Sequence, residues 1–153
     1  YTAIVDRLAR KFETARGLVP QPDFEQVAGA RVAFAAFGTS HWAVVESRDQ
    51  LREEVGLASS YCRLRAYPFP QDLGAFIDAH DRVYVVEQNR DAQMLQLLRL
   101  DLAPERAAKL RSVCHYNGLP IDARSVTDAV LAQEGHAVAA DASPRAGAML
   151  GGE

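Results

Sequence analysis

The sequence predicts an α/β fold, a doubly wound and mostly parallel sheet of four to five strands with helices on both faces. Short apolar runs alternate with segments whose apolar residues recur at helical spacing. Each run precedes such a segment, an order that implies right-handed crossovers between parallel strands. The run 82–87 is the clearest strand buried on both faces. The other three expected strands are 31–37, 60–67 and 111–116.

A helix is expected after each strand. The first of these spans about 40–55, and the strand that follows, 60–67, alternates apolar and polar residues, which is typical of an edge strand or a strand exposed on one face. Asp91 is expected to cap the helix 91–102, and Pro104 is expected to begin a further short helix. The remaining helices are predicted at 71–80 and 122–134.

Length and composition bound the possible functions. The 153 residues match one ordinary α/β domain. Lys and Arg number 17 against 20 Asp and Glu, and the net charge of −3 argues against a nucleic-acid-binding protein, whose phosphate contacts need a basic face. We find no apolar stretch long enough for a membrane span and no signal-peptide pattern at the start. Only two cysteines, Cys62 and Cys114, are present, which fits a reducing, cytoplasmic setting.

The chain divides into three expected parts. Residues 1–29 form a leading helix and a proline-containing linker to a preceding domain, 30–135 form the α/β domain, and 136–153 form a flexible tail rich in alanine and glycine. The leading helix has an apolar stripe, and we expect it to pack on a neighbouring domain. Because the sequence begins at Tyr1 within a helical pattern and without methionine, we interpret it as part of a longer protein.

Ligands of open parallel sheets bind outside the carboxyl ends of the strands, so the loops 38–41, 67–70, 87–91 and 115–118 are the candidate sites. The first loop could hold an anion at a helix N-terminus. It contains only Gly38 of the dinucleotide pattern G-x-G-x-x-G, and His41 and Trp42 are bulky, so a dinucleotide site is disfavoured. We expect Thr39 or Ser40 to cap the following helix.

The third loop is the richest in polar groups, because six polar side chains follow the buried strand 82–87. A carboxylate or amide at a buried strand end must be hydrogen-bonded. A structural network or a subunit interface is the favoured interpretation, and contact with a substrate or cofactor is the alternative. The six residues are Glu87, Gln88, Asn89, Arg90, Asp91 and Gln93.

The usual catalytic patterns do not occur. The four histidines show no metal-binding spacing such as H-E-x-x-H, and no serine lies in a G-x-S-x-G elbow. Cys62 and Cys114 both lie in predicted strands, where a buried and inert thiol is expected. Trp42 and Tyr67 are expected to pack rather than to stack on bases. The residues thus predict a polar rim without a self-sufficient active site.

Several of these segments together resemble a known family. The run 85–93, Val-Val-Glu-Gln-Asn-Arg-Asp-Ala-Gln, is the most specific, and Pro-Phe-Pro at 68–70 precedes it. The segments 10–16 and 116–121 also match. Over roughly residues 6–134 the sequence resembles the C-terminal part of the alpha subunits of 2-oxoglutarate (2-oxoacid):ferredoxin oxidoreductases. His41 and Trp42 depart from the small residues that relatives carry there.

The resemblance implies a transketolase C-terminal-like fold and a part in a thiamine diphosphate-dependent enzyme. Such enzymes decarboxylate a 2-oxoacid oxidatively to an acyl-coenzyme A and reduce ferredoxin. In the family the diphosphate, Mg²⁺ and the iron–sulfur cluster are held by the beta subunit, and the thiamine pyrimidine is contacted by a preceding domain of the alpha subunit. The chain alone is therefore expected to be inactive, with no cofactor of its own, and 2-oxoglutarate is the expected substrate of the complex.

Two uses of the rim stay open, and neither involves catalytic or metal-binding residues of this chain. In the first, the strand-end loops dock on neighbouring domains of the alpha subunit and on the beta subunit. In the second, Gly38, Thr39, Ser40 and Arg90 bind a small anion, either the coenzyme A phosphates or the substrate carboxylate. A free-standing regulatory module is a third interpretation. The candidate contacts are Gly38, Thr39, Ser40, Phe69, Pro70, Glu87, Gln88, Asn89, Arg90, Asp91, Gln93, Asn117 and Gly118.

Overall fold

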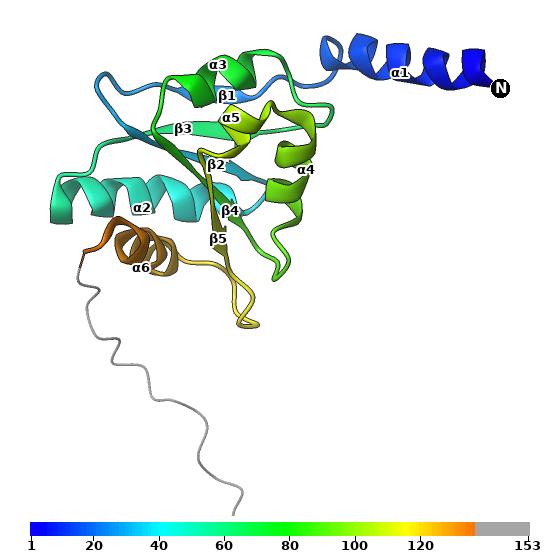
Figure 1. Cartoon of the computed structure of the whole chain (residues 1–153). Coiled ribbons are helices and arrows are strands. Elements are labelled where there is room, and N and C mark those ends of the chain that lie inside the picture. The colour runs from blue at the N-terminus through cyan, green and yellow to red at the C-terminus, as the bar shows by residue number, and fades with distance from the viewer. Residues whose placement is uncertain (137–153) are drawn as a thin grey trace, which may run out of the picture.

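The computed structural model describes residues 1–136 (Figure 1), and the part of the predicted flexible tail from 137 to 153 lies outside the described residues. None of the described helices is both long enough and apolar enough to cross a membrane. In chain order the elements are α1 (Thr2–Arg16), β1 (Asp23–Glu25), β2 (Val32–Phe37), α2 (Ser40–Val55), β3 (Ser59–Leu64), α3 (Asp72–Asp78), β4 (Arg82–Glu87), α4 (Gln93–Asp101), α5 (Pro104–Ala107), β5 (Leu110–Cys114) and α6 (Ala123–Glu134).

The strands of the described part form one sheet in the order β1-β3-β2-β4-β5. All neighbouring pairs are parallel except β1 and β3, which are antiparallel. Helices separate the parallel strands along the chain, as crossover connections between parallel strands require. The predicted fold, a mostly parallel sheet with helices on both faces, is confirmed.

Two apolar layers cover the sheet because successive residues of a strand point to opposite faces. In β2, Val32, Phe34 and Ala36 pack with α2 and α6, while Ala33 and Ala35 pack with α3 and α4. All five side chains are at most 2% exposed. Figure 1 shows α2 and α6 together on one face of the sheet and α3 and α4 on the other. The run of small and branched apolar residues thus explains why β2 lies in the middle of the sheet.

The edge of the sheet differs from the sequence prediction. The segment expected to be only a linker contains β1, in which Phe24 pairs with Cys62 of β3. β3 is therefore an inner strand, and the expectation of an edge strand or a strand exposed on one face is wrong. Its serines mislead because they are small enough to be buried, and the Ser60 hydroxyl accepts a hydrogen bond from the Val27 N–H at 3.0 Å.

The last helix is attached to the sheet by a partly buried ion pair. Arg82, the first residue of β4, donates from Nε and Nη2 to the two carboxylate oxygens of Glu134, both at 2.7 Å. Tyr84 Oη donates to the same carboxylate at 2.5 Å. Burial by itself raises the pKa of Glu134, but the hydrogen bonds from Arg82 and Tyr84 outweigh it and the pKa is lowered.

We expect Glu134→Gln to reduce the loss of stability in acid. A carboxylate whose pKa is lower in the folded state stabilises the fold above its unfolded pKa, and this stabilisation disappears as the pH falls through the folded pKa. The free energy of unfolding in urea should therefore fall more for the wild type than for Glu134→Gln between about pH 5 and pH 3. Glu105→Gln on the exposed surface of α5 is the control. Parallel pH profiles for wild type and Glu134→Gln would contradict this role of the ion pair.

Candidate functional site

The carboxyl ends of β2, β3, β4 and β5 lie along one edge of the sheet, because these strands are parallel. The four candidate loops, 38–41, 67–70, 87–91 and 115–118, follow these ends and form the strand-end rim. Hydrogen bonds show which of the loops are joined to each other and which are held separately.

Glu87, the last residue of β4, is the central group of the rim. Its side chain is fully buried, with 0% exposure. One carboxylate oxygen accepts from Asn89 Nδ2 at 2.6 Å and from the Met94 N–H at 2.8 Å, and the other accepts from the Leu95 N–H at 3.2 Å. The first amides of a helix have no partner within the helix. Glu87 therefore caps α4 from the neighbouring strand.

The predicted cap of this helix, Asp91, is wrong. The helix begins at Gln93 and follows Ala92, which has a left-handed backbone with φ of +52°. The carboxylate of Asp91 instead pairs with Arg90 Nε at 2.7 Å. Asn89 completes the turn, since its side-chain oxygen accepts from the N–H groups of Asp91 and Gln93 at 3.1 and 3.3 Å. A carboxylate six residues before the first residue of the helix thus takes the place of a local cap.

Gln88 joins the loop after β4 to the loop after β2. Its side-chain nitrogen donates to Thr39 Oγ1 at 2.9 Å and to Ser40 Oγ at 3.2 Å. Neither hydroxyl accepts a hydrogen bond from an amide of α2, so the expectation that Thr39 or Ser40 caps that helix is wrong. Gly38 has φ of +57°, a left-handed conformation that favours glycine at this turn.

The Pro-Phe-Pro loop after β3 is held by α1 instead. Pro68, Phe69 and Pro70 are buried, and the peptide bond before Pro68 is cis. Arg16 donates to the Phe69 carbonyl at 2.6 Å and to both oxygens of Asp101 at 2.8 and 2.5 Å. One arginine thus ties the end of α1 to this loop and to the end of α4.

Sequence reasoning missed this contact. Arg16 lies in the segment 10–16 that matches the family, but no local pattern points to its partner, Asp101. Because the partners are separated by 85 residues, only the fold brings them together.

The loop after β5 makes mainly local contacts. Asn117 accepts from the Leu119 N–H at 2.9 Å, His115 Nε2 lies 3.0 Å from the Leu119 carbonyl oxygen, and Gly118 has φ of +90°. No side-chain hydrogen bond within residues 1–136 connects Asn117 to the Glu87 cluster. Arg90 also faces solvent, with its side chain 74% exposed.

The remaining candidates divide into buried and exposed groups. Burial raises the pKa of the Cys62 thiol to about 12, which fits the inert thiol expected there. Trp42 is 74% exposed, so the expectation that it packs within this chain is wrong. Tyr67 is half-exposed and contacts the rings of Phe12 and Phe69 edge-on. Within 1–136 no three His, Cys, Asp or Glu side chains gather closely enough to hold a metal ion.

Comparison with known proteins gives one clear sequence relative. No family model matches the chain. The alpha subunit of 2-oxoacid:ferredoxin oxidoreductase 2 from Aeropyrum pernix is 29% identical over 126 residues, which cover 79% of this chain and 19% of the relative. Over this stretch the chain is similar to a 2-oxoacid:ferredoxin oxidoreductase alpha subunit. The resemblance carried by the strand-end motifs is confirmed, and the chain spans about a fifth of that relative's length.

Solved structures confirm the fold. The 2-oxoglutarate:ferredoxin oxidoreductase of Magnetococcus marinus, solved with 2-oxoglutarate, coenzyme A and succinyl-CoA bound, matches with a TM-score of 0.67 and 22% identity, over 79% of this chain and 21% of that chain. A split-gene transketolase, solved as an inactive beta4 tetramer, matches with a TM-score of 0.61 and 18% identity, over 73% of this chain and 40% of that chain. The transketolase-like α/β fold implied by the motifs is thus confirmed.

We expect Glu87→Ala to destabilise the fold strongly. It leaves the amides of Met94 and Leu95 without their acceptor in a buried place, and the expected loss is about 2–4 kcal/mol in the free energy of unfolding in urea. Glu87→Gln keeps one acceptor oxygen and should lose less. Asp91→Ala, which removes only an exposed ion pair, is the matched control and should change the free energy by less than about 1 kcal/mol. Equal stability of Glu87→Ala and Asp91→Ala would show that Glu87 is not the helix cap.

Arg16→Ala is expected to release α1 from the body of the domain. Without its bonds to Asp101 and the Phe69 carbonyl, the helix keeps few contacts, and its amides should exchange with deuterium faster, by about tenfold or more. Arg10→Ala, on the same exposed helix, is the control. Unchanged exchange over 2–16 in Arg16→Ala would mean that other contacts hold the helix.

Proposed function

We infer that this chain is the C-terminal domain of the alpha subunit of a thiamine diphosphate-dependent 2-oxoacid:ferredoxin oxidoreductase, in which it mainly packs domains and subunits together. The sequence relative and the shared fold support this assignment. The complete complex would oxidatively decarboxylate its 2-oxoacid to the acyl-coenzyme A. 2-Oxoglutarate is the proposed substrate, and the Magnetococcus marinus enzyme, solved with 2-oxoglutarate and succinyl-CoA, supports that choice.

The packing role is supported by the hydrogen bonds that the polar side chains of the rim make within the chain. Glu87 is used on the amides of α4, Asn89 on the turn before that helix, and Gln88 on the hydroxyls of Thr39 and Ser40. Groups bound in this way hold the loops in one shape. A rim of fixed shape suits docking against another protein surface, where preorganised loops lose little entropy on binding.

The cofactors and partners of the proposal belong to the complete complex. Thiamine diphosphate, Mg²⁺ and the iron–sulfur cluster would lie in the beta subunit and in preceding domains of the alpha subunit. Ferredoxin and coenzyme A would be used there as well, in the cytoplasm. The chain by itself is proposed to be inactive and to bind none of these cofactors alone.

The leading helix supports a role as a joint. Ile4, Val5, Leu8 and Phe12 form an apolar stripe on α1, and each is about half-exposed. Figure 1 shows α1 extending away from the sheet and its covering helices. The stripe continues into a shallow apolar groove, lined by side chains such as Phe12 and Tyr67. We propose that α1 and the segment between α1 and β1 connect the domain to a preceding domain that covers this stripe, whereas β1 belongs to the sheet.

Binding of a small anion by the same loops is the alternative. Arg90 favours it, because its exposed guanidinium pairs only with its neighbour Asp91 within residues 1–136. The hydroxyls of Thr39 and Ser40 accept hydrogen bonds from Gln88, and their own O–H groups stay available as donors to an anion. The relation to the oxidoreductase subunits favours the packing role over a free-standing regulatory module.

Arg90→Ala in the complete enzyme complex tests the proposal. If the rim docks on a neighbouring domain, loss of this exposed guanidinium should weaken subunit assembly by about tenfold, measured by analytical ultracentrifugation. The thiamine diphosphate affinity of the assembled enzyme should change much less. Arg99→Ala, an exposed position on α4, is the control. Normal assembly combined with a selective loss of 2-oxoglutarate turnover would overturn the packing role.

A further inference from the structure

The shallow groove beside α1 has two apolar walls. Leu8 and Phe12 form the wall on the helix, and Tyr67 and Pro68 form the wall on the loop after β3. The rings of Phe12 and Tyr67 lie edge to face, with their centres 6.2 Å apart. Leu8, Phe12 and Tyr67 are each about half-exposed, so the walls of the groove gain stability when another apolar surface covers them.

Positive charge borders this groove on one side. Lys11 is the one charged residue that lines it in the described part of the chain. Because an α-helix has 3.6 residues per turn, Arg7 lies one turn before Lys11 on the same side of α1, beside the apolar stripe. The same geometry places Asp6, Arg10 and Glu13 on the opposite side of the helix. The carboxylates of α1 are therefore too far round the helix to neutralise this border.

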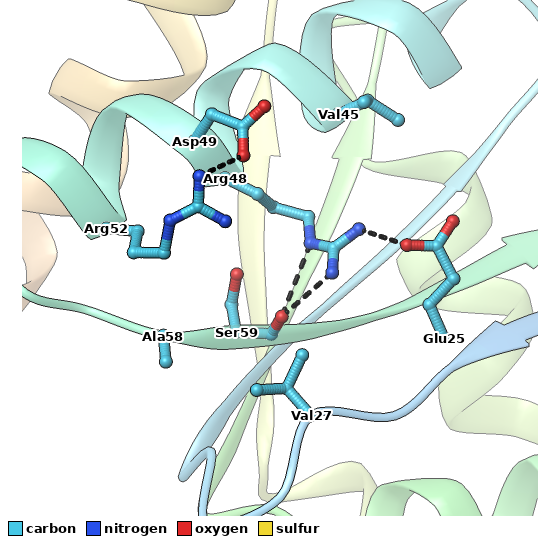
Figure 2. Close-up of a pocket in the computed structure, with 8 residues that line it drawn as sticks. All are labelled: Glu25, Val27, Val45, Arg48, Asp49, Arg52, Ala58 and Ser59. Carbon is cyan, nitrogen blue, oxygen red and sulfur yellow. Dashed lines mark hydrogen bonds and ion pairs between the residues drawn. The ribbon is translucent and has the colours of Figure 1, made fainter.

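The two cations at the border have no partner within residues 1–136. Arg7 and Lys11 are exposed and make no ion pair or side-chain hydrogen bond there, whereas the ion pairs of α1 belong to Arg16. Other arginines of the domain are paired. Figure 2 shows two examples on α2, Arg48 and Arg52, which bind carboxylates of the chain at 2.7 and 2.8 Å. The positive charge beside the groove is thus left for another surface to neutralise.

The charge and the shape of this surface distinguish between possible occupants. A second copy of the chain fits poorly, because its own α1 would bring the same cations to the border of the stripe and like charges across an interface repel. A flat lipid surface also fits poorly, because the loop that carries Tyr67 and Pro68 forms a second wall beside the helix. A ridge on a folded protein can contact both walls at once.

Resting on the proposed joint to a preceding domain, we propose that the surface covering α1 is an apolar ridge bordered by Asp or Glu side chains. The ridge packs between Phe12 and Tyr67, and its carboxylates pair with Lys11 and Arg7. Water is partly excluded beside such a ridge, so these pairs are screened less than pairs on an open surface. Charge pairs at the border of an interface fix the register of the two surfaces. The cations of α1 therefore determine in which direction the preceding domain lies along the helix.

Hydrogen–deuterium exchange in the complete enzyme complex tests the proposal. In the wild type, the amides of 2–16 should exchange at least about tenfold more slowly in the complex than in this chain alone, because the preceding domain covers the helix. Lys11→Glu places a negative charge against the carboxylates of the ridge and should speed this exchange in the complex by about tenfold. Arg10→Glu makes the same change of charge on the opposite side of α1 and should exchange like the wild type.

The remaining measurements separate the possible outcomes. Lys11 is exposed, so Lys11→Glu should fold, with unchanged exchange in β2 and β4, and Arg7→Glu is a second variant that should act in the same way. Slow exchange over 2–16 in the complexes of the wild type and of both variants would overturn the acidic border and leave the joint intact. Equal exchange over 2–16 in the wild-type complex and in the chain alone would overturn the joint and this inference together.

Two further results would assign the groove to another occupant. Protection of 2–16 that increases with the concentration of the chain alone, without protection in the complex, would identify a second copy as the cover. Protection by phosphatidylglycerol vesicles, again without protection in the complex, would identify a lipid surface. Either result would overturn the proposal.

Discussion

The parallel pairing of β2 and β4, buried on both faces, is the constraint from which the other features follow. Val32 pairs with Arg82 and Ala36 with Val86, and helices cover the residues between them on both sides. A strand in this place has no contact with water along its length. Its polar residues therefore have to stand at its ends and find partners there. Arg82 at one end binds Glu134, and Glu87 at the other binds the amides of α4.

The Glu87 carboxylate determines the shape of the rim. To receive hydrogen bonds from Met94 and Leu95, the chain has to turn back sharply after β4, and Ala92 takes a left-handed backbone in that turn. The same turn leaves the side chains of Gln88, Arg90 and Asp91 exposed. The hydrogen bonds to the buried carboxylate of Glu87 thus determine which side chains of the rim a neighbouring protein can reach.

Local sequence patterns predicted the elements well where burial determines them. The run 82–87 is β4, and the apolar spacing of 122–134 is that of α6, with Asp122 accepting from the Ser125 N–H as its cap. The patterns failed where a residue distant in the sequence determines the local structure. Asp91 has the residue type and place of a helix cap, but the carboxylate of Glu87 takes its amides.

The three-residue strand β1 was missed because it is short, lies beside prolines and pairs with β3, which is distant in the sequence. The bond from Arg16 to Asp101 has no local sequence signal at all. For the site, the residue types of the rim were predictable from the sequence. Which of these residues face solvent depends on the hydrogen bonds around Glu87, and only the structure shows those hydrogen bonds.

The rim and the helix α1 differ in the surface that they offer to a partner. At the carboxyl edge most polar groups are bound within the chain, so a partner there would meet a preformed surface. Along α1 the opposite holds, because its stripe is apolar and exposed while the helix is fixed only near Arg16. A surface of that kind gains stability only when another apolar surface covers it. The proposed joint and the proposed docking surface would therefore differ in kind, since the leading helix needs an apolar cover and the rim offers groups that are already held in place.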